Sequence, residues 1–241
     1  MVGLPLRGSR RLYNVGTLYE TYKKEYNKQN DTARRGRKSN RSMTEKQQVR
    51  KEIREKINAT SEEYRSSASA SIALNVLTMP EVRDCKTILA YFSVGKEPAT
   101  LALISKLLEE GKRVCLPLCV DLDEEGHRTG TVDAMEARVI KSFDDLVPGA
   151  YGIPEPSADT EVMLPEYVDL IILPCLSCDR NCNRIGHGAG YYDKYLTKIR
   201  SDCFTLAICF EEVLADEIPT EPHDRPVDAV VTEKQIYRWR R

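Results

Sequence analysis

The sequence predicts an α/β fold: a mainly parallel sheet with helices on both faces, arranged as three α/β/α layers and preceded by a disordered basic N-terminal tail. Three observations predict this fold. Short, near-continuous apolar runs recur along the chain, as strands covered on both faces require. Segments with helical periodicity lie between these runs. The first 42 residues are instead basic and poor in apolar side chains.

The N-terminal segment is expected to be an extension rather than a domain. Residues 1–42 carry eleven Lys and Arg against three acidic residues, and so few apolar side chains cannot offset the entropy of ordering the chain. We therefore expect one domain over residues 43–241. The segment lacks the apolar core of a secretory signal, so a cytoplasmic location is expected, with a mitochondrial presequence in residues 1–42 as the alternative.

The helical part begins directly after this tail. Thr44 followed by Gln47 forms a capping box, and an apolar stripe continues the helix, made of Val49, Ile53 and Ile57. A basic stripe lies beside it, made of Lys46, Arg50 and Arg54. Thr60 with Glu63 repeats the capping signal for a second helix, which runs to Met79 and ends at Pro80.

The core of the chain then alternates between strands and helices. Residues 87–92 read as a buried strand, 100–111 as an amphipathic helix closed by Gly111, and 113–118 as the next strand, which together make a βαβ unit. Residues 131–140 are typical of a further strand, whereas the Pro-rich residues 148–156 are expected to form a loop.

Three more apolar runs follow, at residues 168–174, 204–210 and 227–232. Their unbroken apolar character is typical of central strands in a parallel sheet. No apolar run approaches the roughly 20 residues that cross a bilayer, so no membrane span is expected.

The segment "NRIGHGAGYYDKYL" (183–196) carries the most informative pattern. Gly186, Gly188 and Gly190 alternate, so the backbone can approach a ligand without Cβ obstruction. A helix that begins near Tyr191 offers unpaired N–H groups to phosphate, and Arg184 can add a bidentate contact. The spacing fits neither the Rossmann fingerprint nor the P-loop.

Other side chains of this segment admit two interpretations each. Asp193 could hold Mg²⁺ on a bound phosphate or could only stabilise the helix N-terminus. His187 could carry a proton or bind phosphate, or could be a polar surface residue. Of Tyr191 and Tyr192, one could stack on a planar ligand while the other packs into the core.

Eight cysteines are expected to be free thiols in an intracellular protein. Cys175, Cys178 and Cys182 form C-x₂-C-x₃-C close to His187, which raises the alternative of a zinc site. Structural zinc usually takes two separated ligand pairs, and the sequence has no second pair, so ordinary thiols are favoured.

These motifs resemble one family, the 5-formyltetrahydrofolate cyclo-ligases, also called 5,10-methenyltetrahydrofolate synthetases. "RIGHGAGYYDKYL" is similar to the family's signature, and the resemblance extends from residue 46 to about residue 236 through "KQQVRKEI", "YFSVGKEPATLALISKLLEEGKRVCLP" and "PHDRPVDAVVTE". The resemblance implies the ATP- and Mg²⁺-dependent cyclisation of 5-formyltetrahydrofolate to 5,10-methenyltetrahydrofolate. ADP and phosphate would be released after phosphorylation of the formyl oxygen.

The resemblance also implies roles for individual residues. Catalytic roles fall to Arg184, His187 and Tyr191. ATP would contact Lys46, Arg50, Arg184, Gly186, Gly188, Gly190 and Tyr192. The folate would contact Phe92, Glu97, His187, Gly188, Ala189, Gly190 and Tyr191. Mg²⁺ would be held by Asp193 and Asp228.

This chain departs from the family pattern at a few positions around the loop. Cys175 and Cys178 stand where the family has a Pro-Gly-aromatic run, Cys182 stands in place of glycine, and Ala189 in place of Gly or Lys. These changes put the catalytic rate in doubt more than the fold. Two alternatives remain: a non-catalytic relative that binds RNA through the basic tail, and an enzyme for another phosphate-bearing substrate. The expected partners are folate and ATP, with no nucleic acid or membrane, and a monomer is expected.

Overall fold

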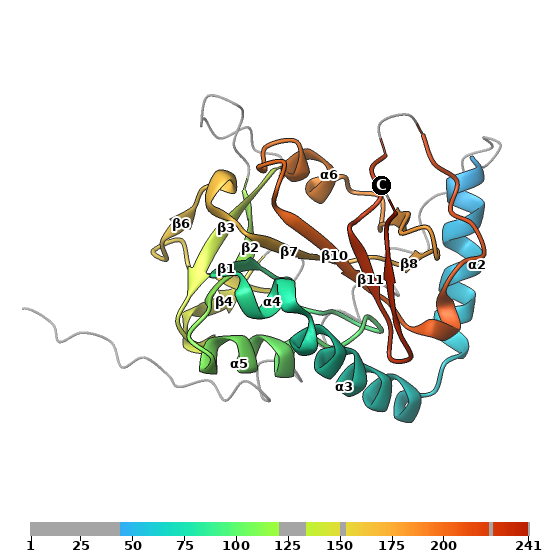
Figure 1. Ribbon diagram of the computed structural model, residues 1–241, viewed down its shortest axis with the longest axis horizontal. Coiled ribbons are helices and arrows are strands. Elements are labelled where there is room, and N and C mark those ends of the chain that lie inside the picture. The colour runs from blue at the N-terminus through green and yellow to red at the C-terminus, as the bar shows by residue number, and fades with distance from the viewer. Residues whose placement is uncertain (1–43, 121–133, 150–152, 222–223, 241) are drawn as a thin grey trace, which may run out of the picture.

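The computed structural model describes residues 44–120, 134–149, 153–221 and 224–240. Within these residues the main sheet has eight strands, in the order β12-β11-β10-β7-β1-β2-β3-β6 (Figure 1). Their bounds are β1 Thr87–Leu89, β2 Arg113–Val120, β3 Ala134–Ile140, β6 Val162–Met163, β7 Leu170–Leu173, β10 Phe204–Ile208, β11 Ala229–Val231 and β12 Ile236–Arg238. The predicted basic tail (residues 1–42) lies outside the described residues, so the domain boundary predicted at residue 43 stays a prediction.

The centre of the sheet is parallel, as predicted. β11, β10, β7, β1 and β2 pair in parallel, whereas β12, β3 and β6 join the two edges in antiparallel register. All four residues of β7 are buried, because this strand is covered on both faces. The first strand is shorter than predicted: β1 ends at Leu89, and Phe92 follows it still buried.

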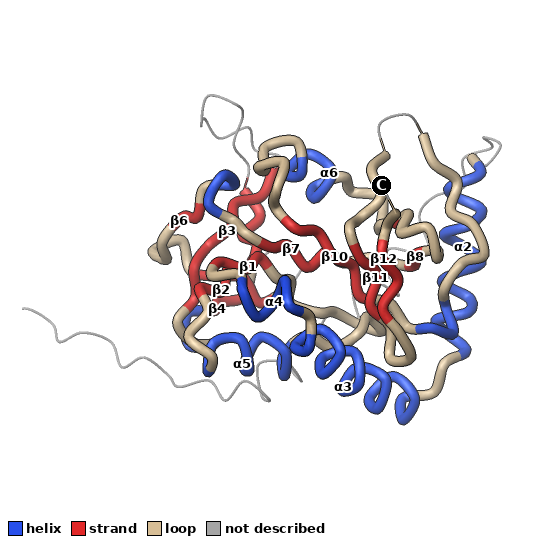
Figure 2. The backbone as a smooth tube through the Cα atoms, in the orientation of Figure 1, coloured by secondary structure: helices blue, strands red, loops and turns tan. Residues whose placement is uncertain are grey.

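Helices cover both faces of this sheet and complete the predicted three layers. Their bounds are α2 Glu45–Ala59, α3 Glu62–Thr78, α4 Pro80–Asp84, α5 Leu101–Glu109 and α6 Tyr191–Leu196. In Figure 2, α3, α4 and α5 lie on one side of the strands and α6 lies on the other, while α2 stands beyond one end of the sheet. No helix within the described residues is long and apolar enough to span a membrane.

The helix starts follow local capping chemistry, with one correction. Thr44 Oγ1 accepts from the Gln47 N–H, and Gln47 Oε1 accepts from the Thr44 N–H, which is the predicted capping box. The cap of α3 is Ser61 rather than the predicted Thr60, because Ser61 Oγ accepts from the Tyr64 N–H at 3.1 Å. Pro80 does end α3, and it also opens α4, where its missing N–H costs nothing.

Two short antiparallel pairs lie outside the main sheet. The loop predicted at 148–156 is wrong at its two ends, where Pro148 belongs to β4 (Leu146–Pro148) and residues 154–156 form β5 (Pro154–Pro156), paired with each other. Prolines are tolerated here because neither strand has a partner on its other side within the described residues. Residues 150–152 lie outside the described residues. The second pair, β8 Ser177–Cys178 with β9 Arg184–Ile185, is a hairpin that follows β7 directly.

The order of the strands decides where a ligand can bind. β1 lies between β2 and β7. The chain leaves β1 toward the β6 edge, returns to β7 on the other side of β1, and then continues toward the β12 edge. The connections that leave the carboxyl ends of β1 and β7 therefore lead to opposite edges of the sheet, and the space between the starts of two such connections is the position where open α/β sheets bind ligands.

Candidate active site

The loops that follow β1 and β7 meet at this position through Glu97 and His187. His187 Nε2 lies 2.8 Å from Glu97 Oε1, and the other carboxylate oxygen, Oε2, accepts from the Val94 N–H at 2.8 Å. The Glu97 side chain is only 10% exposed, whereas that of His187 is 43% exposed. The structure thus joins two residues for which the family resemblance implies folate binding, and two hydrogen bonds orient the carboxylate of Glu97.

Arg184 anchors the glycine loop to the carboxyl end of β7. Its Nη1 donates to the Pro174 carbonyl oxygen, and its Nη2 pairs with Asp193 Oδ1. The Arg184 side chain is largely buried, whereas that of Asp193 is 67% exposed. Asp193 therefore presents a carboxylate to solvent beside a fixed guanidinium, an arrangement that suits a metal-phosphate group.

The structure explains why glycine occupies two positions of the loop. A Cβ on Gly186 would lie 2.9 Å from Arg184 Nη1, so a larger residue there would require the Arg184 guanidinium to shift from its present contacts. Gly188 has φ of +104°, which side chains rarely adopt. Gly190 is the N-cap of α6, which spans only six residues, so backbone N–H groups of the loop would matter more than a long helix dipole.

Helix α2 packs against the β8–β9 hairpin, just before the glycine loop, through a small apolar cluster. Ile53 packs with Leu176, Ile185 and Ile218, and the predicted stripe residues Val49 and Ile57 pack beside them. This docking brings Arg50 to the loop, where its Nε donates to the Gly186 carbonyl oxygen at 3.0 Å.

Lys46, one turn earlier on the same helix, has different partners. Its Nζ lies 2.6 Å from Glu221 Oε2 and 2.5 Å from Asp224 Oδ2, in the segment between β10 and β11. Burial lowers the pKa of Lys46, but hydrogen bonds to these two carboxylates outweigh burial and raise it above its usual value. Of the two predicted phosphate cations on α2, Arg50 contacts the glycine loop, while Lys46 is held by carboxylates.

The second predicted metal ligand, Asp228, is hydrogen-bonded to Thr205, whereas Asp193 is paired with Arg184. Its Oδ2 accepts from the backbone N–H and the hydroxyl of Thr205, each at 2.9 Å. The segment before it reaches the β8–β9 hairpin, because the Val227 N–H donates to the Cys182 carbonyl oxygen at 2.9 Å. The structure pairs the two predicted metal ligands with separate partners, so a metal shared by Asp193 and Asp228 stays a prediction.

The sequence did not single out Tyr91, whose side chain lies in the same interior region. The hydroxyl groups of Tyr91 and Tyr192 are buried, and no described residue hydrogen-bonds to either. Burial, and next the nearby charge of Glu97, raise the pKa of both phenols. Buried hydroxyls are nearly always paired in native proteins, so these two are candidates for contact with a bound ligand or water. The only sequence signal for Tyr91 is its place beside Phe92 at the end of an apolar run.

The cysteines do not form the zinc site considered as an alternative. Cys178 Sγ lies 3.6 Å from Cys175 Sγ, and both are buried beside Cys209. Hydrogen bonding to Cys175 and Cys209, together with burial, raises the pKa of Cys178. Over the described ranges, no group of three or more His, Cys, Asp or Glu residues could hold a metal ion. His187, the fourth candidate ligand, hydrogen-bonds to Glu97 instead.

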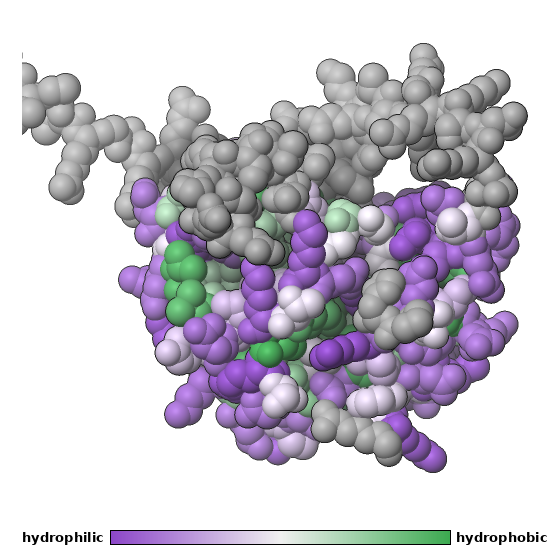
Figure 3. Space-filling model, turned by 90° about the horizontal axis from the view of Figure 1, so that it is seen from above, coloured by the Kyte–Doolittle hydropathy of each residue, from purple (hydrophilic) through white to green (hydrophobic). Residues whose placement is uncertain are grey.

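The face that carries α6 has a mixed surface. Figure 3 views the molecule from this side, and hydrophobic residues are visible at its centre between hydrophilic ones.

Comparisons with known proteins support the family resemblance. The model of the 5-formyltetrahydrofolate cyclo-ligase family matches residues 42–233. A probable 5-formyltetrahydrofolate cyclo-ligase of Schizosaccharomyces pombe is 30% identical over 207 residues, which are 80% of this chain and 97% of the relative. A mitochondrial 5-formyltetrahydrofolate cyclo-ligase of Arabidopsis thaliana is 27% identical over 209 residues, 80% of this chain and 75% of the relative.

A solved structure supports the same assignment. The NMR structure of 5,10-methenyltetrahydrofolate synthetase from Aquifex aeolicus superposes with a TM-score of 0.69 at 30% identity, covering 82% of this chain and 94% of that one. The family match, the shared fold and the meeting of the glycine loop with the loop after β1 lead to one conclusion: the chain belongs to the 5-formyltetrahydrofolate cyclo-ligase family, whose members are enzymes of folate metabolism.

Proposed function

We propose that the chain converts 5-formyltetrahydrofolate to 5,10-methenyltetrahydrofolate with ATP and Mg²⁺, releasing ADP and phosphate after phosphorylation of the formyl oxygen. The observation that carries this proposal is the 2.8 Å contact between Glu97 and His187. It joins the loop expected to bind the pterin ring with the glycine loop expected to bind phosphate. A reaction between a folate and a nucleotide requires these two sites to be adjacent.

The chemistry explains why the site contains cations and glycines. A formamide oxygen is a poor leaving group, so the second folate nitrogen cannot displace it in an unactivated formyl group. Transfer of the terminal phosphoryl group to that oxygen turns it into phosphate, which leaves readily. The protein then has to position two ligands and neutralise charge, which needs no covalent nucleophile.

The phosphate-binding role falls to three cations and the loop backbone. Arg184 pairs with Asp193 in the first turn of α6, and Arg50 donates to the Gly186 carbonyl oxygen of the glycine loop. We infer that phosphate oxygens take the place of these partners when ATP binds. Lys46 would join them by leaving Glu221 and Asp224. The backbone from Gly186 to Tyr192 would supply N–H donors.

Asp193 and Asp228 are the proposed Mg²⁺ ligands. The donor set fits the ion, because Mg²⁺ usually takes one or two carboxylates and completes its shell with phosphate oxygens and water. When bound, the ion would supply charge neutralisation at the transferred phosphoryl group. Asp193 is exposed enough to reach it, and Asp228 would approach from the segment that Cys182 holds against the hairpin.

The folate-binding role falls to residues on both loops. Glu97 would accept hydrogen bonds from the pterin ring, with Phe92 as an apolar wall and His187 and Tyr191 near the reacting group. Ala189 and the adjacent glycines would pass close to the substrate. The buried hydroxyls of Tyr91 and Tyr192 offer two further donors in the same region.

We propose that the chain acts as a monomer. A cytoplasmic location is proposed, with the mitochondrion as the alternative because one relative is named as mitochondrial. Imaging a fluorescent fusion with and without residues 1–42 separates the two locations.

The direct test is the ultraviolet absorbance of the methenyl product. Full-length protein with ATP, Mg²⁺ and 5-formyltetrahydrofolate should generate this absorbance, and Asp193→Asn should lose most of it. Asp159→Asn is a matched control, because Asp159 is exposed and outside the site. No product at high enzyme concentration, together with RNA binding that disappears when residues 1–42 are deleted, would support the RNA-binding relative instead.

A further inference from the structure

Three buried cysteines lie together at the base of the β8–β9 hairpin. Cys175 follows β7, Cys178 ends β8 and Cys209 follows β10. Cys178 Sγ lies 3.6 Å from Cys175 Sγ, and the Cys175 and Cys178 thiols both hydrogen-bond to Cys209. Cys175 and Cys178 are departures from the family pattern, and the proposed reaction uses none of the three. This cysteine trio is therefore a cluster of nucleophilic groups without an assigned role.

The pairing of two parallel strands places Cys175 beside Cys209. Leu173 of β7 is opposite Ala207 of β10, and each cysteine follows two residues later. Neighbouring strands lie about 4.8 Å apart, and Cα atoms joined through a disulfide are usually about 4.4–6.8 Å apart. Cys175 Sγ donates to the Ile208 carbonyl oxygen at 3.3 Å, so its side chain points toward the chain that leaves β10. A disulfide between Cys175 and Cys209 is therefore compatible with an intact sheet.

Hydrogen bonds make Cys209 the most acidic sulfur of the cysteine trio. Those from the Cys175 and Cys178 thiols, together with one from the Cys178 N–H, outweigh burial and lower the pKa of Cys209 well below its usual value. Cys175 accepts a hydrogen bond from Cys178, which lowers its pKa, but its own bond to Cys209 and burial outweigh this and raise it. The thiolate is the form that reacts with oxidants, so Cys209 is the attacking sulfur and Cys175 a neighbouring thiol.

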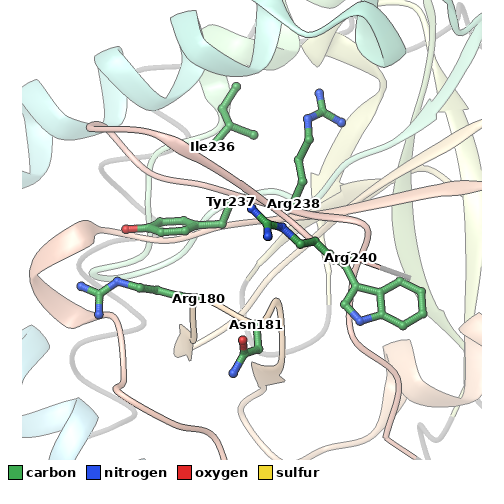
Figure 4. Close-up of a pocket in the computed structure, with 7 residues that line it drawn as sticks. Arg180, Asn181, Ile236, Tyr237, Arg238 and Arg240 are labelled. Atoms are coloured by element: carbon green, nitrogen blue, oxygen red, sulfur yellow. The ribbon is translucent and has the colours of Figure 1, made fainter.

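Burial restricts the size of the oxidant that can reach this cluster. Cys175 is 5% exposed and Cys209 is 1% exposed. The hairpin turn borders an open pocket of about 660 Å³, and Figure 4 shows Arg180 of this turn beside Tyr237 of β12. The pocket brings solvent to the hairpin two residues after Cys178. Hydrogen peroxide is uncharged and close to water in size, so it suits this site, whereas a bulky charged disulfide does not.

We propose that the cysteine trio is a reversible oxidation site, in which hydrogen peroxide converts Cys175 and Cys209 to a disulfide. The Cys209 sulfur attacks one peroxide oxygen, the O–O bond breaks, and the departing hydroxide takes up the Cys209 proton and leaves as water. The Cys175 sulfur then attacks the sulfenic sulfur, the S–S bond forms, the S–O bond breaks, and the oxygen leaves with the Cys175 proton as a second water. The two thiols lose two electrons, which reduce the peroxide. A dithiol reverses the reaction by exchange.

The disulfide acts on the proposed active site through the neighbours of Cys175 in the sequence. The Pro174 carbonyl oxygen accepts from Arg184 Nη1 at 3.4 Å, and Leu176 packs with Ile53 of α2. Closing the bond pulls Cys175 toward β10, which shifts both contacts. Oxidation should therefore raise KM for ATP about fivefold, the effect of losing one hydrogen bond. This part of the inference rests on the proposed function, whereas the oxidation site itself does not.

Peptide mapping of the full-length protein tests the site without any turnover. After treatment with hydrogen peroxide and alkylation of the remaining thiols, fragmentation spectra should place a link between Cys175 and Cys209, and dithiothreitol should remove it. Oxidised glutathione at the same concentration should leave both residues as thiols. Cys85→Ser, a control at a partly exposed cysteine outside the trio, should form the link with an unchanged yield. The link in the unmodified chain is measured without any variant, so a variant that fails to fold leaves this result intact.

Kinetics with and without peroxide test the effect on the proposed active site. KM for ATP should rise about fivefold after oxidation of the unmodified chain and of Cys85→Ser, and return with dithiothreitol, while Cys209→Ser should show no rise. Absence of the link, a link that involves Cys178 instead, or an equal yield with oxidised glutathione overturns the oxidation site. A link that forms with KM unchanged overturns its effect on Arg184. Failure of the proposed function is seen separately, as an absence of product from the reduced enzyme.

Discussion

Glu97 and His187 are ninety residues apart in the sequence, and their side chains lie 2.8 Å apart where the loops after β1 and β7 meet. The contact connects the two halves of the proposed active site before substrate binds. Glu97 is nearly buried and keeps one oxygen on the Val94 N–H, so its second oxygen is held in a fixed direction.

Glu97→Gln is expected to weaken folate binding while the fold is kept. The amide preserves the shape of the side chain but removes its charge, and hydrogen bonds to charged groups contribute about 1.5–3 kcal/mol. We expect KM for the folate to rise about tenfold or more in the absorbance assay.

The control for this variant is Glu110→Gln, at an exposed position after α5. A double-mutant cycle with His187→Ala should give a coupling energy of about 0.5–3 kcal/mol for the pair. Additive effects of the two substitutions would contradict a direct role for the contact.

Gly188→Ala is expected to reduce activity more than stability. The φ of +104° at Gly188 strains any side chain, at a cost of about 1–3 kcal/mol. The added Cβ would lie 3.7 Å from Arg50 Cζ, an ordinary contact, so the expected effect comes from the strained backbone of the loop that is proposed to bind phosphate.

Gly111→Ala separates backbone strain from this local effect. Gly111 has φ of +75°, and a Cβ there would meet nothing within 4 Å. Thermal unfolding should therefore shift in both variants, while only Gly188→Ala loses most of its kcat/KM. Equal activity losses would mean that strain anywhere in the fold limits catalysis.

Ile53→Ala is expected to loosen α2 from the hairpin. Removing a buried isoleucine side chain costs about 2–5 kcal/mol, and the small size of the cluster places this site toward the lower value. Because Arg50 is one turn away on α2, KM for ATP should rise as well. Leu74→Ala, at a side chain that is 65% exposed, should change the free energy of unfolding by less than about 0.5 kcal/mol. An unchanged KM for ATP in Ile53→Ala would mean that Arg50 reaches its position without the cluster.

Stability is expected to fall as pH rises above 9. Burial raises the pKa of Cys182 to about 11 and that of Cys203 to about 12, whereas an unfolded cysteine titrates near 9.0. Between these values the unfolded state has already lost protons that the folded state keeps, so the free energy of unfolding decreases with pH. Well below pH 9 these thiols are protonated in both states and contribute no pH dependence.

Melting temperatures in reducing buffer from pH 8 to 10.5 measure this effect. The Cys203→Ala variant lacks one of the titrating thiols, so its melting temperature should fall less steeply than that of the unmodified chain. A constant melting temperature across this range in the unmodified chain would contradict the burial of these groups.

Local patterns in the sequence predicted most helices and strands of this fold, because capping and apolar periodicity depend on residues that are close together in the sequence. The capping box of Thr44 and Gln47 is formed as predicted, and the parallel centre of the sheet follows from unbroken apolar runs such as β7. One error concerned the start of α3. Its N-cap is Ser61, one residue after the predicted Thr60. Either hydroxyl could cap the helix, and only the backbone geometry selects one of them.

The departures from the family pattern acquire a physical meaning only in the structure. Cys182, which stands where the family usually has glycine, has φ of +64°, a left-handed conformation that glycine adopts most readily. Cys175 and Cys178 are packed with Cys209, which lies after another strand, and no spacing in the sequence connects the three.

The sequence by itself determined the fold class, the glycine loop and the basic stripe on the first helix, because periodicity and turn chemistry are properties of short segments. The tertiary structure decided which of these features meet. Strand order placed Glu97 against His187, docking of Ile53 brought Arg50 to Gly186, and Lys46 was directed to Glu221 and Asp224. These contacts join residues 90 to 178 positions apart, and they form only when the sheet and the helices pack around one core.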